Sequence, residues 1–250
     1  VRAYRDQVFV VKLGGDVVGD PEALEQVTAQ LALLSSLSIR LVVVHGGGPQ
    51  ASALSRRLGI EPRMVAGRRV TDDAALGVAK MVYAGQLNVD VLAALRAHRV
   101  QAVGLSGVDA DLITAHRRPP VRVVDDAGAT LTVDYGHVGD IDRVDPRVLL
   151  TLMEARFVPV VASLAGGEDG EVFNVNADTV AESLAVALRA QKLIFLTGAP
   201  GVLRDRNDPS TLVTFADPDD LAGLVASGVL TGGMRPKVEA CIRAATGGVE

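Results

Sequence analysis

The chain has 250 residues, which fits one large domain or two closely joined lobes. Hydrophobic residues make up 48% of the chain, enough for a buried core, and this excludes an intrinsically disordered protein. Aromatic residues make up only 3%, so the core must consist of Val, Leu, Ile and Ala, as in a parallel sheet covered by helices. The net charge of −5 argues against nucleic acid or an anionic membrane as a partner.

The composition also indicates a soluble protein of a reducing compartment, the cytoplasm. The single cysteine, Cys241, has no partner for an internal disulfide bond, and the sequence contains no Cys/His cluster for zinc. No apolar run reaches the roughly 18 residues of a membrane-spanning helix. No signal peptide is visible, although the chain begins with Val1 rather than Met.

The chain opens with two units in which a buried strand ends in glycines and a helix follows. The apolar, β-branched runs at residues 8–13 and 40–45 are the predicted strands. Helical spacing follows at residues 21–37 and 49–58, and Pro49 suits the first helical position. Two such units in succession predict right-handed crossovers between parallel strands.

The rest of the chain continues this alternation, with one interruption. Between residues 112 and 138, short alternating pieces around Asp125–Gly128 predict an antiparallel hairpin added to the main sheet. The other predicted elements are helices at 71–83, 88–98, 146–155, 178–189, 218–227 and 234–245, and strands at 101–105, 157–161 and 192–196. This order predicts an α/β fold, a three-layer α-β-α sandwich around a mainly parallel sheet. We expect an N-lobe at residues 1–172 and a C-lobe at 173–250, sharing one continuous sheet.

The glycine loops after the first two strands are candidate phosphate sites. Lys12 lies next to the end of an apolar strand, where it either reaches solvent or points at a phosphate beyond the carboxyl edge of the sheet. Three glycines at residues 46–48 expose consecutive N–H groups at the start of a helix, which is more than a simple turn needs. These glycines also match the dinucleotide fingerprint GxGxxG/A, but weakly, because they do not follow the first strand and no acidic ribose partner is present.

Two later segments carry further polar residues. Asn174, Asn176 and Asp178 alternate before an Ala/Leu-rich helix, and although Asp178 alone would be an ordinary N-cap, three polar side chains together predict a site. The chain has only four lysines, so Lys12 and Lys237, each in a glycine-containing loop, indicate a need for a compact ammonium group.

Taken together, these segments resemble the amino acid kinase family. The matching stretches follow the family's order from about Val8 to Thr246: VVKLGGD, VVVHGGGPQ, GRRVT, VGLSGVD, GHVGD, FNVNADTVA, LTGAPGVL and LTGGMRPKVEA. The resemblance implies a sandwich like that of carbamate kinase, with an acetylated amino acid in the N-lobe and ATP with Mg²⁺ in the C-lobe. It also implies a homo-oligomer, either a dimer or a hexamer.

The members with the most similar motifs phosphorylate the γ-carboxylate of N-acetyl-L-glutamate with ATP, for arginine synthesis. A carboxyl group with a pKa of about 4.3 is ionised at neutral pH, so this reaction needs no general base. It needs charge neutralisation, because an anion attacks an anion.

The resemblance also assigns individual residues. It implies that Lys12 and Lys237 stabilise the transferring phosphoryl group and that Asp178 orients both lysines. The substrate-binding residues it implies are Gly47, Gly48, Arg69, Asn174 and Asn176, with Arg69 on the α-carboxylate. The ATP-binding residues it implies are Gly14, Gly15, Thr197, Gly198, Gly201, Gly233 and Met234. It implies no metal ligand from the chain itself.

The sequence departs from the family pattern in three places. The family usually has an aspartate where Gly198 stands, in a loop that helps to bind the nucleotide. The chain ends at Glu250, short of the family's final strand, which predicts a piece of a longer protein. Residues 1–7 resemble the end of the N-terminal helix of arginine-regulated members.

Three alternatives stay open. One is a kinase for a carrier-linked α-aminoadipate, although HGGGP and GRRVT favour the free acetylated substrate. Another is a catalytically idle module of the same fold that serves as an arginine sensor, motivated by Gly198 and the end at Glu250, against which Lys12 and Lys237 argue. The third is a nicotinamide dehydrogenase, which rests only on the weak glycine fingerprint.

Overall fold

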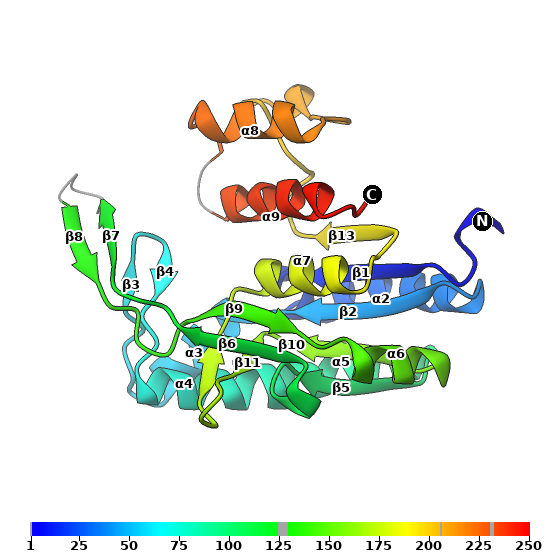
Figure 1. Ribbon diagram of the computed structural model, residues 1–250, viewed down its shortest axis with the longest axis horizontal. Coiled ribbons are helices and arrows are strands. Elements are labelled where there is room, and N and C mark those ends of the chain that lie inside the picture. Colours follow the sequence, from blue (N-terminus) through cyan, green and yellow to red (C-terminus); the bar gives the residue numbers. More distant parts are fainter. Residues whose placement is uncertain (1, 125–129, 206, 231–232) are drawn as a thin grey trace.

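Five parallel strands form the central sheet of the computed structural model (Figure 1), which describes residues 2–124, 130–205, 207–230 and 233–250. Each strand is a short, mainly apolar run that suits burial on both faces. All five strands predicted from the sequence are present. In spatial order they are β13 (Lys192–Leu196), β1 (Val8–Leu13), β2 (Arg40–His45), β10 (Val158–Ala162) and β5 (Ala102–Ser106).

Helices cover both faces of this sheet, which confirms the three-layer sandwich. Side chains alternate along a strand, so Phe9, Val11 and Leu13 of β1 pack in one layer and Val10 packs in the other. The first layer contains α2 (Pro21–Ser36), α3 (Gly48–Arg57), α4 (Asp73–Ala79) and α5 (Asn88–Ala97). The second layer contains α6 (Arg147–Glu154), α7 (Ala177–Ala187) and α9 (Met234–Thr246).

Smaller elements complete the described chain. The helix α8 (Pro218–Ala226) packs on α9 around a separate small core of Leu224, Leu230 and Val238. The short helical segments are η1 (Arg2–Tyr4), α1 (Gly15–Val18), η3 (Asp109–Asp111) and η4 (Pro209–Thr211). None of the described helices combines the length and the apolar character needed to cross a lipid bilayer.

The predicted hairpin is present, but its expected place on the main sheet is wrong. The strands β7 (Val121–Val124) and β8 (Thr130–Val133) form a separate two-stranded antiparallel ribbon. The turn predicted at Asp125–Gly128 lies outside the described residues. The strands that precede and follow this ribbon in the chain, β6 (Ile113–Arg117) and β9 (Gly139–Val144), belong to a second sheet. That sheet also contains β11 (Leu164–Gly166) and β12 (Val172–Asn174). In the view of Figure 1, a further ribbon, β3 (Met64–Val65) with β4 (Arg68–Arg69), is seen at the same end of the molecule as β7 and β8.

One continuous helical run replaces two predicted helices. The helix α4 passes directly into the π-helix η2 (Lys80–Leu87) and then into α5, so the predicted break between residues 83 and 88 is wrong. A π-helix is wider than an α-helix, and π-helical turns are frequent at functional sites. Asn88, the first residue after η2, is buried.

The strand β1 joins the two predicted lobes within one sheet. It pairs with β2 on one side and with β13 on the other, and Lys12 lies between Val44 and Phe195 in this register. The predicted boundary between residues 172 and 173 lies inside β12. The assignment of one ligand to each lobe stays a prediction.

Candidate active site

Two lysines and one aspartate from distant parts of the chain meet beyond the carboxyl end of β1. Lys12 shares a strand face with Val10, so its side chain points toward the α7 layer. Its Nζ lies 2.8 Å from Oδ1 of Asp178, in the first turn of α7. Nζ of Lys237, in the first turn of α9, lies 3.2 Å from Oδ2 of the same carboxylate. The structure therefore brings together the three residues that the resemblance assigned to phosphoryl transfer.

This lysine–aspartate group is largely removed from solvent. The side chains of Lys12 and Asp178 are each 7% exposed, and that of Lys237 is 18% exposed. Burial lowers the pKa of the Lys12 ammonium below that of an ordinary lysine, while the neighbouring Asp178 carboxylate opposes this shift. With both lysines protonated the group keeps a net positive charge, which attracts an anionic ligand.

The two glycine loops lie next to each other beside this group. The Gly15 carbonyl oxygen accepts a hydrogen bond of 2.6 Å from Nε2 of Gln50, so the side chain of Gln50 connects the loops. A Cβ atom added to Gly47 would collide with the Leu87 side chain, whereas one added to Gly48 would meet no heavy atom within 4 Å. Gly47 is therefore needed for packing against η2, and Gly48 faces open space in which a ligand can approach the backbone.

A buried histidine supports the second glycine loop. Nδ1 of His45 lies 3.1 Å from the Gly46 carbonyl oxygen, and Nε2 lies 3.1 Å from Nδ2 of Asn88. Asn88 also donates to the Val160 carbonyl oxygen at 3.1 Å. These partners assign a neutral ring that donates from Nδ1 and accepts at Nε2. Burial lowers the pKa of His45 to about 4.

This histidine predicts a loss of stability in acid. The unfolded chain binds a proton at His45 below about pH 6.5, whereas the folded chain resists protonation down to about pH 4. The contribution of His45 is therefore complete above pH 6.5, and about 3 kcal/mol of the free energy of unfolding is lost as the pH falls to 4. Urea unfolding of the native chain and of His45→Gln across this range measures the effect. Parallel pH profiles for the two proteins would contradict it.

The residues predicted to bind the substrate lie around the second loop. Nη2 of Arg69, on β4, donates to the Gly48 carbonyl oxygen at 2.9 Å and to Oγ of Ser52 at 2.5 Å. Nδ2 of Asn174, at the end of β12, donates to Oγ1 of Thr71 at 3.1 Å. Arg69 and Gly48 are thus brought together, and Asn174 lies against the segment that follows Arg69.

The N-cap of α7 is Asn176 and not Asp178. Oδ1 of Asn176 accepts hydrogen bonds from the backbone N–H groups of Asp178 at 2.7 Å and Thr179 at 3.4 Å. Asp178 is the second residue of α7, and its carboxylate faces the lysines instead. Asp178 is therefore not an N-cap, the alternative weighed above against a site, and the assignment of Asn176 to the substrate stays a prediction.

The residues predicted to bind ATP lie in three loops around the lysines. The Gly14 N–H donates to the Leu196 carbonyl oxygen at 2.8 Å, which ties the first loop to the end of β13. The Gly233 carbonyl oxygen lies 3.4 Å from Nζ of Lys237, and Met234 packs against the small core of α8 and α9. Thr197, Gly198 and Gly201 follow β13 directly. Thr231 and Gly232, from the loop before α9, lie outside the described residues.

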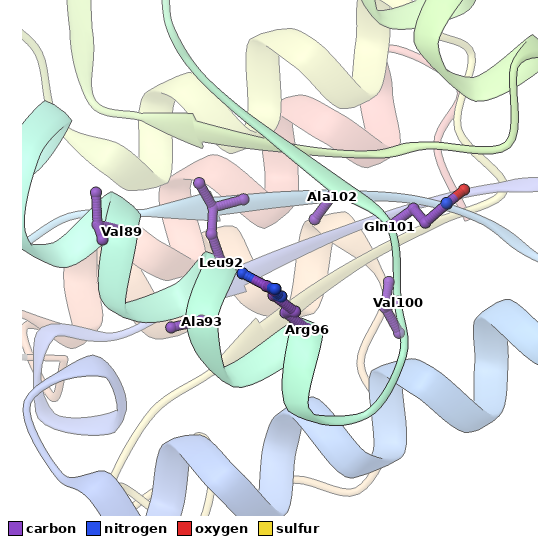
Figure 2. A pocket seen from close by; sticks show the side chains of 7 residues that line it. All are labelled: Val89, Leu92, Ala93, Arg96, Val100, Gln101 and Ala102. Atoms are coloured by element: carbon purple, nitrogen blue, oxygen red, sulfur yellow. The ribbon is translucent and has the colours of Figure 1, made fainter.

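Two hollows of the described structure lie away from the lysine–aspartate group. One of about 540 Å³ lies between α5 and β5 (Figure 2), and a second of about 320 Å³ lies beside β6 and β11. Neither includes Lys12, Asp178 or Lys237 among its lining residues. The first is mostly apolar and has Arg96 as its one charged lining residue. We place the site by converging charges, because phosphoryl transfer depends on them more than on an apolar cavity.

Sequence reasoning missed several polar residues that support the site. They are Asp16, His45, Gln50, Ser52, Thr71 and Asn88. A signal was present for His45, since a histidine is unusual at the end of a buried strand, and for Asp16, an acid directly after a glycine pair. The other four have contacts that only the folded chain defines.

A parallel sandwich with glycine loops and paired lysines at the carboxyl edge of its sheet defines a class of small-molecule phosphotransferases. The chain belongs to the amino acid kinase family, whose sequence profile matches residues 7–250. It is 54% identical to an acetylglutamate kinase of Myxococcus xanthus, over 100% of this chain and 81% of that protein. It is 48% identical to one of Anaeromyxobacter dehalogenans, over 97% of this chain and 88% of that protein.

Solved structures show the same fold. An N-acetylglutamate synthase of Neisseria gonorrhoeae, complexed with coenzyme A and N-acetyl-glutamate, superposes with a TM-score of 0.81 at 27% identity. The match covers 100% of this chain and 54% of the synthase, so this chain spans about half the length of that protein. Giardia carbamate kinase has a TM-score of 0.67 at 16% identity, over 96% of this chain and 89% of that one.

Proposed function

We propose that this chain is a kinase that transfers the γ-phosphoryl group of ATP to the γ-carboxylate of N-acetyl-L-glutamate. The product is N-acetylglutamyl 5-phosphate, an intermediate of arginine biosynthesis. The observation that supports this most is the pair of lysines on Asp178 beside two glycine loops. The acetylglutamate kinases that are 54% and 48% identical to the chain support the choice of substrate.

The chemistry follows from the charges of the site. A γ-carboxylate oxygen of the substrate bonds to the γ-phosphorus of ATP while the bond from that phosphorus to the bridging oxygen breaks, and ADP leaves. The carboxylate is already ionised at neutral pH, so no base has to remove a proton. Lys12 and Lys237 neutralise the charge on the transferring group, and Asp178 holds both ammonium groups in place before the reaction begins.

The glycine loops and Arg69 position the two substrates. N–H groups of Gly47 and Gly48 bind the acetylated substrate and the moving phosphoryl group. Arg69 exchanges its present acceptors, the Gly48 carbonyl oxygen and Ser52, for the α-carboxylate, and Asn174 assists it. The nucleotide is held by Gly14, Gly15, Thr197, Gly198, Gly201, Gly233 and Met234.

Mg²⁺ fits this site as a companion of ATP. The described residues contain no group of three His, Cys, Asp or Glu side chains that could hold a metal ion by themselves, and Asp178 has both oxygens directed at lysines. The ion would therefore be held mainly by the phosphates, and it would shield their charge. The proposal also includes a cytoplasmic location and a homo-oligomer, a dimer or a hexamer.

A catalytically idle regulatory module is the second candidate. The N-acetylglutamate synthase of similar fold supports this candidate, because in that protein the fold makes up only about half of a chain that is named for a different reaction. The lysine–aspartate group argues against it, since an idle module has no need for two ammonium groups on one buried carboxylate.

A hydroxamate assay for acyl phosphate separates these functions. With ATP and Mg²⁺, we expect product to form faster from N-acetyl-L-glutamate than from N-succinylglutamate, N-acetyl-α-aminoadipate, aspartate or carbamate. The one extra methylene of the aminoadipate derivative should cost about 10- to 200-fold in kcat/KM. Faster turnover of the aminoadipate derivative would mean that this compound, and not N-acetyl-L-glutamate, is the preferred substrate. No product from any of these acids would contradict the kinase and favour the idle module.

A further inference from the structure

Asp16 connects the first glycine loop to the loop that follows β13. It is the second residue of α1, and its Oδ2 accepts a hydrogen bond from the backbone N–H of Gly198. The Gly14 N–H also donates to the Leu196 carbonyl oxygen at 2.8 Å. Two hydrogen bonds therefore join these loops, one between backbones and one through the carboxylate of Asp16.

The Asp16 carboxylate occupies space that side chains at two other positions would need. A Cβ atom on Gly198 would lie 2.5 Å from Oδ2 of Asp16, and one on Gly14 would collide with Oδ1. The backbone alone does not require glycine at these positions, because Gly14 has a φ of −64° and Gly198 is not among the glycines with a positive φ. A side chain at either position would therefore have to displace the Asp16 carboxylate.

The same contact explains the departure at Gly198. The sequence has glycine where the family usually has an aspartate, and the structure places the Asp16 carboxylate at the position that a side chain of residue 198 would take. Asp16 is also close enough to Lys12 for its negative charge to raise the pKa of that ammonium.

We propose that Asp16 is a positioning residue for the nucleotide. Through Gly198 it holds the loop after β13 against Gly14 and Gly15, and it thereby fixes the backbone that surrounds the phosphates. This inference rests on the proposed function, because it takes these glycines as part of the ATP site.

Binding of Mg·ADP, measured by titration calorimetry without the second substrate, tests this role. Asp16→Ala is expected to raise the Kd about tenfold, the scale of one hydrogen bond to a charged group. Asp16→Asn keeps an acceptor oxygen and should stay within about threefold of the native Kd. Gly198→Ala should weaken binding about as much as Asp16→Ala, because its methyl group displaces the carboxylate. The double variant should be about as weak as either single variant, since both remove the same contact.

Asp20→Ala is the matched control. Asp20 is an exposed aspartate that accepts backbone hydrogen bonds at 2.9 and 3.3 Å as the N-cap of α2, so its loss should lower Tm and leave the Kd unchanged. An equal rise in Kd for Asp20→Ala would reduce Asp16 to a purely structural role and overturn the inference. Additive effects of Asp16→Ala and Gly198→Ala, or an Asp16→Asn variant as weak as Asp16→Ala, would also overturn it.

The outcome is separable from that of the proposed function. A native chain that binds Mg·ADP but forms no acyl phosphate contradicts the kinase, while the variant series still decides the role of Asp16. A native chain that binds no Mg·ADP contradicts both. In an active enzyme, Asp16→Ala should raise the KM for ATP and leave the KM for N-acetyl-L-glutamate within about twofold, because the contact lies on the nucleotide side.

Discussion

Replacement of either lysine of the site by alanine is expected to lower kcat at least about 100-fold, the scale of removing one preorganised donor from a developing charge. Lys12 and Lys237 contact the same carboxylate, at 2.8 and 3.2 Å, so each supplies a fixed positive charge that the other does not replace. Lys→Arg should also be impaired, because a planar guanidinium does not fit the place of a compact ammonium. Steady-state kinetics with both substrates varied measures the effect.

Lys80→Ala is the matched control for these variants. Lys80 is an exposed lysine at the start of η2, so its removal changes the net charge equally without touching the site. We expect its kcat to equal that of the native enzyme. Near-normal turnover in both Lys12→Ala and Lys237→Ala would refute the assigned role, provided that thermal unfolding shows both variants to be folded.

Asp178→Asn is expected to lower both activity and stability. The substitution keeps the size of the side chain but leaves two ammonium groups without a counter-charge, one of them 7% exposed. Removing one partner of a buried ion pair costs about 3 to 5 kcal/mol. We expect a loss of about 3 kcal/mol in the free energy of unfolding, because Lys237 is partly solvated, and a fall in kcat of at least about 100-fold. Urea unfolding and steady-state kinetics measure the two losses.

A second variant separates these two losses. Lys12→Met combined with Asp178→Asn removes the most buried unpaired charge, so much of the lost stability should return while activity stays low. Glu182→Gln is the control on the same helix: Glu182 pairs with Arg243 at 2.7 Å, but Arg243 is half exposed, so the loss should be below about 1 kcal/mol. If Asp178→Asn were as stable and as active as the native chain, the aspartate would have no organising role.

The main sandwich was predictable because its signals are local. The strands β1 and β2 are apolar runs that stop at glycines, and α2 begins at Asp20 followed by proline. The π-helix η2 was not predictable, because its residues also suit an α-helix and its wide turn is set by packing in the core. The strands β11 and β12 have three residues each, too few to show an alternating pattern.

The same limit applies to the site. Lys12, Asp178 and Lys237 each stand in a short motif of their own, so each could be singled out from its neighbours in the sequence. Contacts between motifs could not be predicted in this way. His45 is an unusual residue for the end of a buried strand, but nothing near it in the sequence points to Asn88 as its partner, and the fold alone brings the two together.

The position of β1 in the sheet has a consequence for synthesis on the ribosome. β1 is made well before β13 (Lys192–Leu196), yet one of its two edges is covered by β13. Until β13 has been made, the nascent chain therefore carries an apolar strand with one unpaired edge, the kind of edge that pairs with other chains and aggregates. The yield of folded protein in the cell should therefore depend more on chaperones during this interval than on the stability of the finished fold.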